Sequence, residues 1–335
     1  MDKNEILNSD YDVRVSVAEN PSTSVDVLTE LAKDRDWYIR SYAACNPNML
    51  VDVLTELSKD SDYIVRCLVA RNPNTPTGVL SELAKDSQWV VRRYAACNPN
   101  MPVGVLSELA NDINWYVRVS VAENPSTSVD VLTELAKDRD WYIRSYAACN
   151  PNMLVDVLTE LSKDSDYIVR CLVARNPNTP TGVLSELAKD SQWVVRRYAA
   201  CNPNMPVGVL SELANDINWY VRVSVAENPS TSVDVLTELA KDSDWEVRAK
   251  VAENPNTPAD VLMKLAESGN SVVRKNAAGN PNTPAGVLRE LAKDRDWRVR
   301  MSVAHNPATS IDVLIELSKD EDDRVVVNKA IKCKW

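Results

Sequence analysis

Apolar and polar residues follow a helical spacing that recurs every 26 residues along the chain. The frame set on Val13 returns at Ile39, at Val65 and at nine further positions, which makes twelve full units before a fragment that starts at Val325. Within each unit, apolar positions three and four residues apart predict two short amphipathic helices. No segment has the alternating pattern of a β-strand, so we expect an all-α protein.

Long stretches of the chain are copies of one another. Residues 13–116 recur without substitution as residues 117–220, and residues 221–242 repeat residues 13–34 once more. The copied block of 104 residues contains four units, and the 26-residue period continues into units whose sequences differ. We therefore predict an α-solenoid, a superhelix of about twelve two-helix repeats.

The ends of both predicted helices can be read from the sequence. Asp36 is a candidate N-cap for a helix over residues 37–45, and the pair Asn46–Pro47 ends that helix because the residue before proline avoids helical geometry. In several units the second helix is expected to open at a Thr-Pro pair, with the hydroxyl as its cap: Thr75–Pro76, Thr257–Pro258 and Thr283–Pro284. In the first unit, Thr23 and Asp26 approximate a capping box.

A helical wheel at about 100° per residue divides the first helix into two arcs. Trp37, Ile39, Arg40, Ala43 and Ala44 fall in an arc that hardly varies between units, and we expect this constant arc to be packed. The remaining positions change from unit to unit. Six or so buried apolar side chains, at roughly 1.5 to 3 kcal/mol each, do not cover the ordering of 26 residues at about 1 to 2 kcal/mol each. A single unit should therefore not fold without neighbours.

The variable arc is the candidate binding face, because it mixes aromatic, arginine, aliphatic and cysteine residues, and the first two types are enriched at interfaces. The outward positions of the second helix stay polar and monotonous, which is typical of a solvated wall. The alternative for the variable arc is that its residues pack against each other inside a tightly wound superhelix. The candidate residues are Tyr38, Ser41, Tyr42, Cys45, Ile64, Cys67, Leu68, Arg71, Val90, Arg93, Tyr94, Cys97 and Tyr116, with the copies Tyr142, Tyr146, Arg175, Arg197, Tyr198 and Tyr220.

One arginine recurs in the constant arc of every full unit. A buried guanidinium must be paired or hydrogen-bonded, and Asp36 lies four residues before Arg40, but Gln88 and Asn114 take that place in other units. We therefore expect helix-end carbonyls as partners and a structural ladder, with an anion site as the alternative. Its first members are Arg14, Arg40, Arg66, Arg92 and Arg118.

The coupled pattern VRxxVAxNPxTPxxVLxxLAxD resembles the leucine-rich repeat variant family over essentially the whole chain. The resemblance implies a right-handed solenoid of alternating α and 3₁₀ helices. The 26-residue period is longer than that of the family and leaves room for two full α-helices, as in HEAT-like repeats. The founding member carries an iron–sulfur cluster in a cysteine-rich N-terminal segment, but the first cysteine here is Cys45, so no cluster is expected.

Composition narrows the classes of function. The formal net charge of −10 argues against nucleic acid as a ligand, for which a basic stripe is usual. No stretch reaches the roughly 20 apolar residues of a membrane span, and Met1 to Asp12 is too polar for a signal peptide. Seven cysteines, an odd number, favour reduced thiols in the cytoplasm. We expect no membrane contact and a cytoplasmic location.

Catalytic and metal-binding chemistry is not expected. The only histidine, His305, lies at a variable helix end, and no Gly-rich loop or catalytic triad motif occurs. Cysteines that recur 52 residues apart would be separated by roughly 16 to 20 Å at 8 to 10 Å per unit, too far for a shared metal or a disulfide: Cys45, Cys97, Cys149 and Cys201. We expect no cofactor, no metal and no enzyme.

Two hypotheses about function remain. The first is a scaffold, monomeric by default, whose variable face binds a protein or peptide. The second is a structural or engineered array with no selected ligand, which the uniform copying favours. A base-per-repeat nucleic-acid reader is set aside, because Arg71 and Arg93 with their copies are too few. We divide the chain into an N-terminal cap (1–12), the twelve-repeat solenoid (13–324) and a C-terminal cap helix (325–335).

Overall fold

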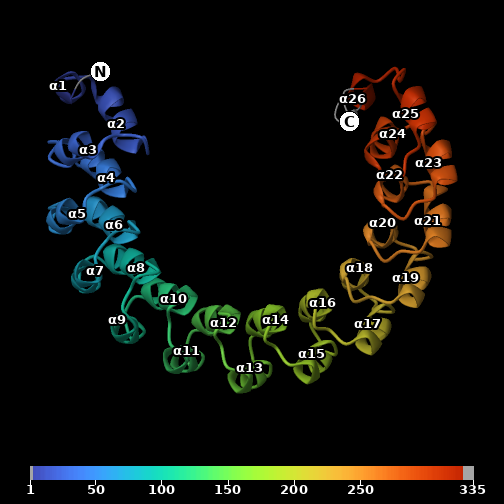
Figure 1. The fold of residues 1–335 in the computed structure, drawn as a ribbon. Coiled ribbons are helices and arrows are strands. Elements are labelled where there is room, and N and C mark those ends of the chain that lie inside the picture. The colour runs from blue at the N-terminus through green and yellow to red at the C-terminus, as the bar shows by residue number, and fades with distance from the viewer. Residues whose placement is uncertain (1–2, 327–335) are drawn as a thin grey trace. The chain divides into compact units, whose positions relative to one another are not determined.

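The computed structural model describes residues 3–326, and every regular element within them is an α-helix. Nine-residue helices alternate along the chain with helices of seven or eight residues, and one pair repeats every 26 residues, as the sequence predicts (Figure 1). Two short helices flank the array, α1 (Lys3–Leu7) and α26 (Asp323–Val326). The all-α solenoid prediction is confirmed. Most of the expected C-terminal cap, residues 327–335, lies outside the described residues.

The chain divides into two compact structural units, Met1–Asn178 and Thr179–Trp335. From here on, "unit" means one of these two parts and "repeat" means one 26-residue stretch. In the first unit the nine-residue helices are α2 (Tyr11–Glu19), α4 (Trp37–Cys45), α6 (Tyr63–Arg71), α8 (Trp89–Cys97), α10 (Trp115–Glu123), α12 (Trp141–Cys149) and α14 (Tyr167–Arg175). In the second they are α16 (Trp193–Cys201), α18 (Trp219–Glu227), α20 (Trp245–Glu253), α22 (Ser271–Gly279) and α24 (Trp297–His305).

Shorter helices follow the nine-residue helices, one after each. In the first unit they are α3 (Val25–Leu31), α5 (Val51–Leu57), α7 (Thr77–Leu83), α9 (Val103–Leu109), α11 (Val129–Leu135) and α13 (Val155–Leu161). In the second they are α15 (Thr181–Leu187), α17 (Val207–Leu213), α19 (Val233–Leu239), α21 (Ala259–Ala266), α23 (Ala285–Leu291) and α25 (Ile311–Leu317). Each seven-residue helix closes in a turn with i to i−3 bonds, such as Lys85 N–H to the Glu82 carbonyl at 3.0 Å.

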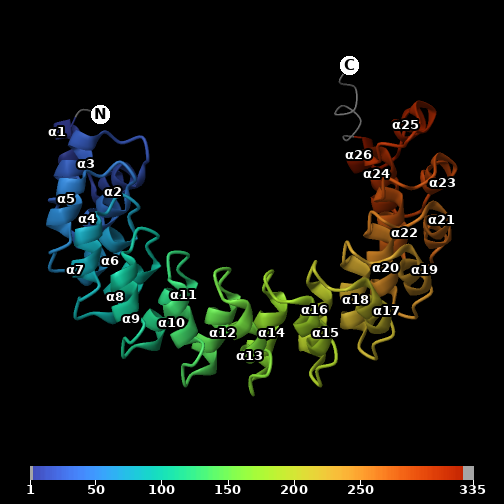
Figure 2. The ribbon, with the colours of Figure 1, turned by 60° about the horizontal axis from the view of Figure 1, so that its bottom comes forward.

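Within each unit, the nine-residue helices lie on the inner side of a curved row and the shorter helices on its outer side (Figures 1 and 2). Consecutive nine-residue helices contact one another along their length, whereas consecutive shorter helices rarely do. The core lies between the two rows and is filled by the constant positions of both helices, for example Ile39, Ala43 and Ala44 of α4 with Leu54 and Leu57 of α5.

The nine-residue helices begin and end where the sequence predicts. The Asp36 carboxylate accepts the N–H of Tyr38 at 2.9 Å, which makes Asp36 the N-cap of α4. Asn46 follows the helix in an extended conformation before Pro47. The end of each repeat's first helix is therefore encoded locally.

The predicted threonine caps of the second helices are wrong. The hydroxyl of Thr75 is buried and donates to the Val69 carbonyl at 2.5 Å, and Pro76 holds the N-cap position of α7. Thr23 likewise donates to the Val17 carbonyl at 2.6 Å and forms no capping box with Asp26. The hydroxyl adds a second hydrogen bond to a carbonyl in the last turn of the preceding helix, since the Val69 carbonyl also accepts the N–H of Asn72 at 3.0 Å.

An arginine–aspartate ladder runs along the N-terminal ends of the nine-residue helices. Arg40 donates to both carboxylate oxygens of Asp60 and, through Nη1, to the Asp34 carbonyl at 2.8 Å. The expected carbonyl partner is therefore present, but the main partner is an aspartate 20 residues further on. Further rungs pair Arg14 with Asp34, Arg66 with Asp86, Arg92 with Asp112, Arg118 with Asp138, Arg144 with Asp164, Arg196 with Asp216, Arg222 with Asp242, Arg274 with Asp294 and Arg300 with Asp320.

A second ladder, of asparagines, joins the C-terminal ends of the same helices. The buried amide of Asn98 donates to the carbonyls of Ala70 and Asn72 in the preceding repeat, over 2.7 and 3.0 Å. Its side-chain oxygen accepts the N–H of Asn100 at 2.9 Å. The Asn-Pro pair thus stops one helix and also ties it to its neighbour, a role that the sequence analysis did not assign.

Candidate binding face

The candidate face is formed by positions 2, 5, 6 and 9 of the nine-residue helices, which lie on the inner row of each unit. Five predicted residues are exposed: Arg71, Cys97, Tyr116, Arg175 and Tyr220. Twelve are half-buried: Tyr38, Tyr42, Cys45, Ile64, Leu68, Val90, Arg93, Tyr94, Tyr142, Tyr146, Arg197 and Tyr198. The face is therefore available over most of the predicted positions.

Two predicted residues do not belong to the exposed face. Ser41 is 2% exposed and Cys67 is 3% exposed. Both occupy position 5, where a small side chain lies in the contact between consecutive helices, and the Ser41 hydroxyl donates to the Tyr38 carbonyl at 2.7 Å. Burial raises the pKa of the Cys67 thiol to about 12. Position 5 reaches solvent where it carries a long side chain, as at Arg93.

Neighbouring side chains on the face contact each other. The hydroxyls of Tyr38 and Tyr42 lie 3.2 Å apart, and this hydrogen bond raises the pKa of Tyr42 to about 12. The Arg93 guanidinium lies 5.8 Å from the ring centre of Tyr94 and 5.7 Å from that of Tyr116 in the next repeat. These contacts fix the positions of the aromatic rings, of which Tyr116 is exposed and the other three are half-buried.

An aromatic row at position 1 was not predicted from the sequence, because the helical wheel places this position in the packed arc. Trp37 is 38% exposed and Trp141 is 36% exposed. Trp89 is more covered because Tyr116 of the next helix stacks on it at 5.1 Å, whereas Trp37 faces a helix with Ile64 at that place. The sequence does contain a signal for the exposure of each ring, namely the residue at position 2 of the following repeat.

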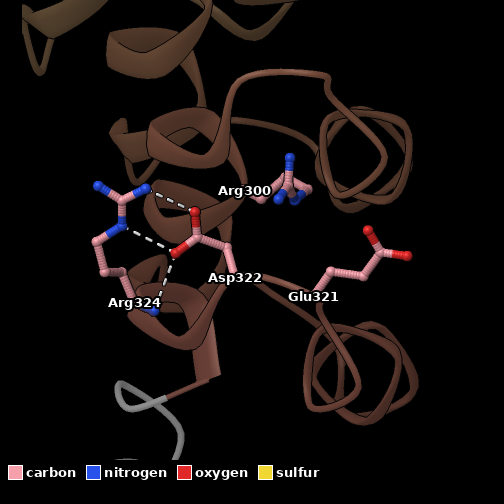
Figure 3. A pocket seen from close by; sticks show the side chains of 4 residues that line it. All are labelled: Arg300, Glu321, Asp322 and Arg324. Carbon is pink, nitrogen blue, oxygen red and sulfur yellow. Dashed lines mark hydrogen bonds and ion pairs between the residues drawn. The ribbon is translucent and has the colours of Figure 1, made fainter.

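A shallow, open depression of about 480 Å³ lies at the C-terminal end of the described residues, lined by Arg300, Glu321, Asp322 and Arg324 (Figure 3). Asp322 accepts hydrogen bonds from Nε and Nη2 of Arg324, which lower its pKa to about 2. Arg300 is engaged with Asp320. The two arginines of the depression are thus paired within the chain, with Asp320 and Asp322.

Residues for other chemistry are not gathered anywhere in the described part of the chain. Within residues 3–326, no group of three potential metal ligands is found. The ring Nδ1 of His305 lies 2.8 Å from the Met301 carbonyl, at the end of its own helix. Six cysteines are free thiols, and Cys333 lies outside the described residues. Across the same 3–326 span, no helix combines the length and the apolarity that a bilayer crossing requires.

The fold and the repeat contacts define a helical repeat solenoid. The model of the leucine-rich repeat variant matches residues 11–36, 64–88, 168–192 and 272–296, and the model of the leucine-rich repeat variant domain matches residues 221–278. The chain therefore contains leucine-rich repeat variant repeats, matched at intervals between residues 11 and 296.

The solved structures that match parts of this chain include the following three. A leucine-rich repeat variant with a novel repetitive structural motif is 28% identical, with a TM-score of 0.49 over 65% of this chain and 86% of that one. An engineered protein is 20% identical, with a TM-score of 0.32 over 93% and 97% of the two chains. Kap121p bound to Nup53p is 12% identical, with a TM-score of 0.40 over 99% and 46%. No curated protein matches the chain.

Proposed function

We propose that this chain is a non-enzymatic, monomeric, cytoplasmic scaffold that binds a protein or peptide on the inner row of nine-residue helices. The observation that carries the proposal is the contrast between the two rows. The inner row varies between repeats and presents tyrosine and arginine side chains to solvent, such as Tyr116 and Arg71. The outer row repeats the same Thr, Ser, Glu and Lys residues. Recognition requires side chains of the first kind.

The position of these residues on the framework also supports the proposal. The arginine and asparagine ladders hold both ends of most inner helices, such as α4 and α8, so the face needs little ordering when a partner binds. The tyrosine pairs, such as Tyr38 with Tyr42, are already held together by a hydrogen bond. A preorganised aromatic surface binds with a small loss of side-chain entropy.

The test compares two variants with four substitutions each in a peptide-display or pull-down experiment. The face variant changes Tyr42, Tyr94, Tyr146 and Tyr198 to serine. The control changes four outer-row valines that are 47 to 48% exposed to serine: Val51, Val103, Val155 and Val207. We expect binders of the wild-type chain to be lost with the face variant and kept with the control. Equal profiles for all three chains would contradict the proposal.

A second candidate function is a structural array without a ligand. Its support is the copying itself, since Tyr42 and Tyr146, or Arg93 and Arg197, are the same residue in the same repeat context. A surface adapted to an irregular partner would be expected to diversify between copies. The nucleotide sequences distinguish the origins, because matching codons in the two blocks indicate recent duplication and different synonymous codons indicate a designed gene.

A further inference from the structure

The aromatic row at position 1 falls into exposed and covered members. The exposed members are 36 to 43% accessible: Tyr11, Trp37, Tyr63, Trp141, Tyr167 and Trp245. The covered members are half-buried: Trp89, Trp115, Trp193, Trp219 and Trp297. The residue that precedes each ring in the sequence differs between the two groups, and the inference is based on this difference.

An aspartate precedes every exposed ring of the row, for example Asp36 before Trp37 and Asp62 before Tyr63. A neutral residue precedes four of the covered rings, for example Gln88 before Trp89. The exposed rings therefore each combine accessible ring surface with a carboxylate on the preceding residue. This combination attracts cations, because the ring quadrupole and the carboxylate act in the same direction.

The fifth covered ring, Trp297, shows what such a ring and its carboxylate bind. Trp297 follows Asp296, but two guanidinium groups of the chain itself cover it. The Arg324 guanidinium carbon lies 3.6 Å from a ring centre of Trp297, and that of Arg298 lies 5.0 Å away. Arg298 also pairs with Asp296, at 3.7 Å, while that aspartate caps α24 by accepting the Arg298 N–H at 2.9 Å. A capping aspartate can thus still hold a guanidinium over the ring.

The geometry points to a basic peptide as the partner, with its arginine or lysine side chains on the exposed position-1 rings as Arg324 lies on Trp297. This inference rests on the proposed function and names its partner class. The net charge of −10 favours a cationic partner. Position 1 borders the candidate face, so a peptide on the inner row can reach both.

The repeat spacing also selects the form of the peptide. Packed helices are about 8 to 10 Å apart, and three residues of a polyproline II helix advance about 9 Å. Every third side chain of that helix lies on the same side. A peptide with a basic residue at every third position therefore matches adjacent exposed rings such as Trp37 and Tyr63, and polyproline II segments generally bind on aromatic surfaces.

The test measures fluorescence anisotropy of a labelled peptide of four Pro-Pro-Arg triplets with the full chain. The ring variant changes Trp37, Tyr63, Trp141 and Tyr167 to leucine. Its matched control changes the covered rings Trp89, Trp115, Trp193 and Trp219 to leucine. The array tolerates a non-aromatic residue at position 1, because Ser271 occupies it in α22. We expect the Kd to rise about tenfold or more in the ring variant and less than about twofold in the control.

A charge variant tests the carboxylates separately by changing Asp36, Asp62, Asp140 and Asp166 to asparagine. Asparagine keeps the N-cap, since Asn114 accepts the N–H of Tyr116 at 2.9 Å as Asp36 does that of Tyr38. We expect the Kd to rise about tenfold here as well. Two further peptides serve as controls: Pro-Pro-Gln triplets should not bind, and Pro-Pro-Pro-Arg units should bind at least about fivefold more weakly.

Three results would overturn the inference: equal loss of affinity in the ring variant and its control, equal binding of the glutamine peptide, or no effect of arginine spacing. A fourth result distinguishes failure of this inference from failure of the proposed function. If the Pro-Pro-Arg peptide does not bind while peptides selected on the wild-type chain are lost in the variant of Tyr42, Tyr94, Tyr146 and Tyr198, the partner class is wrong and the binding face remains.

Discussion

Arg40 donates through Nε and Nη2 to the two carboxylate oxygens of Asp60, over 2.7 and 2.9 Å. The aspartate side chain is 8% exposed, and its Oδ1 also accepts the N–H of Asp62 at 2.9 Å. Asp60 thus closes the turn between two helices and also binds Arg40 of its own repeat. The carbonyl of Asp60 accepts from Arg66 of the next repeat at 2.7 Å, so the ladder connects repeats in series.

Replacing Asp60 with asparagine should destabilise this part of the array. The amide keeps the bond to the Asp62 N–H but removes the charge that faces the guanidinium, which should cost about 1 to 2 kcal/mol. Hydrogen exchange of α4 and α6 measures the local loss. Glu56→Gln, on an exposed side chain of α5, is the control and should change protection little. Equal protection in both variants would show that the rung contributes nothing measurable.

The rung at Arg248 is incomplete. Ser268 stands 20 residues further on, where the rungs named above have aspartate, and Arg248 donates to the carbonyls of Asp242 and Ser243. Ser268→Asp should therefore supply the missing carboxylate and stabilise α20 and α22 by about 1 kcal/mol. Urea denaturation and hydrogen exchange report the gain. Ser243→Asp, in an exposed turn, is the control, and a gain of the same size there would indicate a general charge effect.

Acid should weaken the ladder as a set. Burial by itself raises the pKa of Asp60, but the hydrogen bonds from Arg40 and from the Asp62 N–H outweigh it, so the pKa lies below the usual 3.8. The same balance holds at Asp112, Asp164 and Asp216. The unfolded chain then binds more protons, and stability is full above the ordinary carboxyl pKa and falls as the pH drops through the folded-state values.

Circular dichroism during acid titration tests this expectation. The helix signal should persist between pH 7 and about pH 4 and decline below it, because the affected carboxylates titrate in that range. The loss should come at a higher pH in a chain with several rungs removed. A midpoint near pH 6 in the wild type would require a different titrating group, and full helicity at pH 2 would show that the rungs contribute little.

Cysteine reactivity should follow the two cysteine positions of the nine-residue helices. Cys67 and its copy Cys171 are buried at position 5, and the raised pKa of Cys67 leaves almost no thiolate near pH 8. Cys97, Cys149 and Cys201 are exposed at position 9. We expect Ellman's reagent to modify the position-9 thiols in the native chain and the position-5 thiols only after denaturation. Mass spectrometry of the modified peptides identifies each site, and rapid native modification of Cys67 would contradict its burial.

The sequence predicted the features that are encoded within one helix. The bounds of α4 and its cap at Asp36 follow from residues next to each other, so they could be read directly. The arginine partner could not, because Asp60 lies in a turn that a wheel of α4 does not include. The hydroxyl of Thr75 was misassigned for the same reason, since its acceptor belongs to the preceding helix.

Errors on the candidate face have a similar cause. A wheel gives the direction of each side chain but not the distance to the next helix, so the burial of Ser41 and Cys67 was missed. It also placed Trp37 in the packed arc, although the exposure of that ring depends on the residue that the next repeat contributes. On the candidate face, contacts between repeats therefore limit what a single helix can predict.

The asparagine ladder offers the most specific test of coupling between repeats. Asn98 is 2% exposed and holds two carbonyls of the preceding repeat, those of Ala70 and Asn72. Asn98→Ala leaves these buried acceptors without that donor and should cost about 2 to 3 kcal/mol. Because neighbouring repeats stabilise each other, the loss should spread to the hydrogen exchange of both α6 and α8.

Asn100→Ala is the matched control for this substitution. Asn100 also donates across the repeat boundary, to the Pro73 carbonyl at 2.8 Å, but it is exposed, so water can replace the lost bond. We expect a loss below about 1 kcal/mol, confined to the turn. If both variants lose protection equally, burial of the amide does not determine its contribution. If Asn98→Ala affects α8 alone, the ladder caps each helix without coupling it to the repeat before.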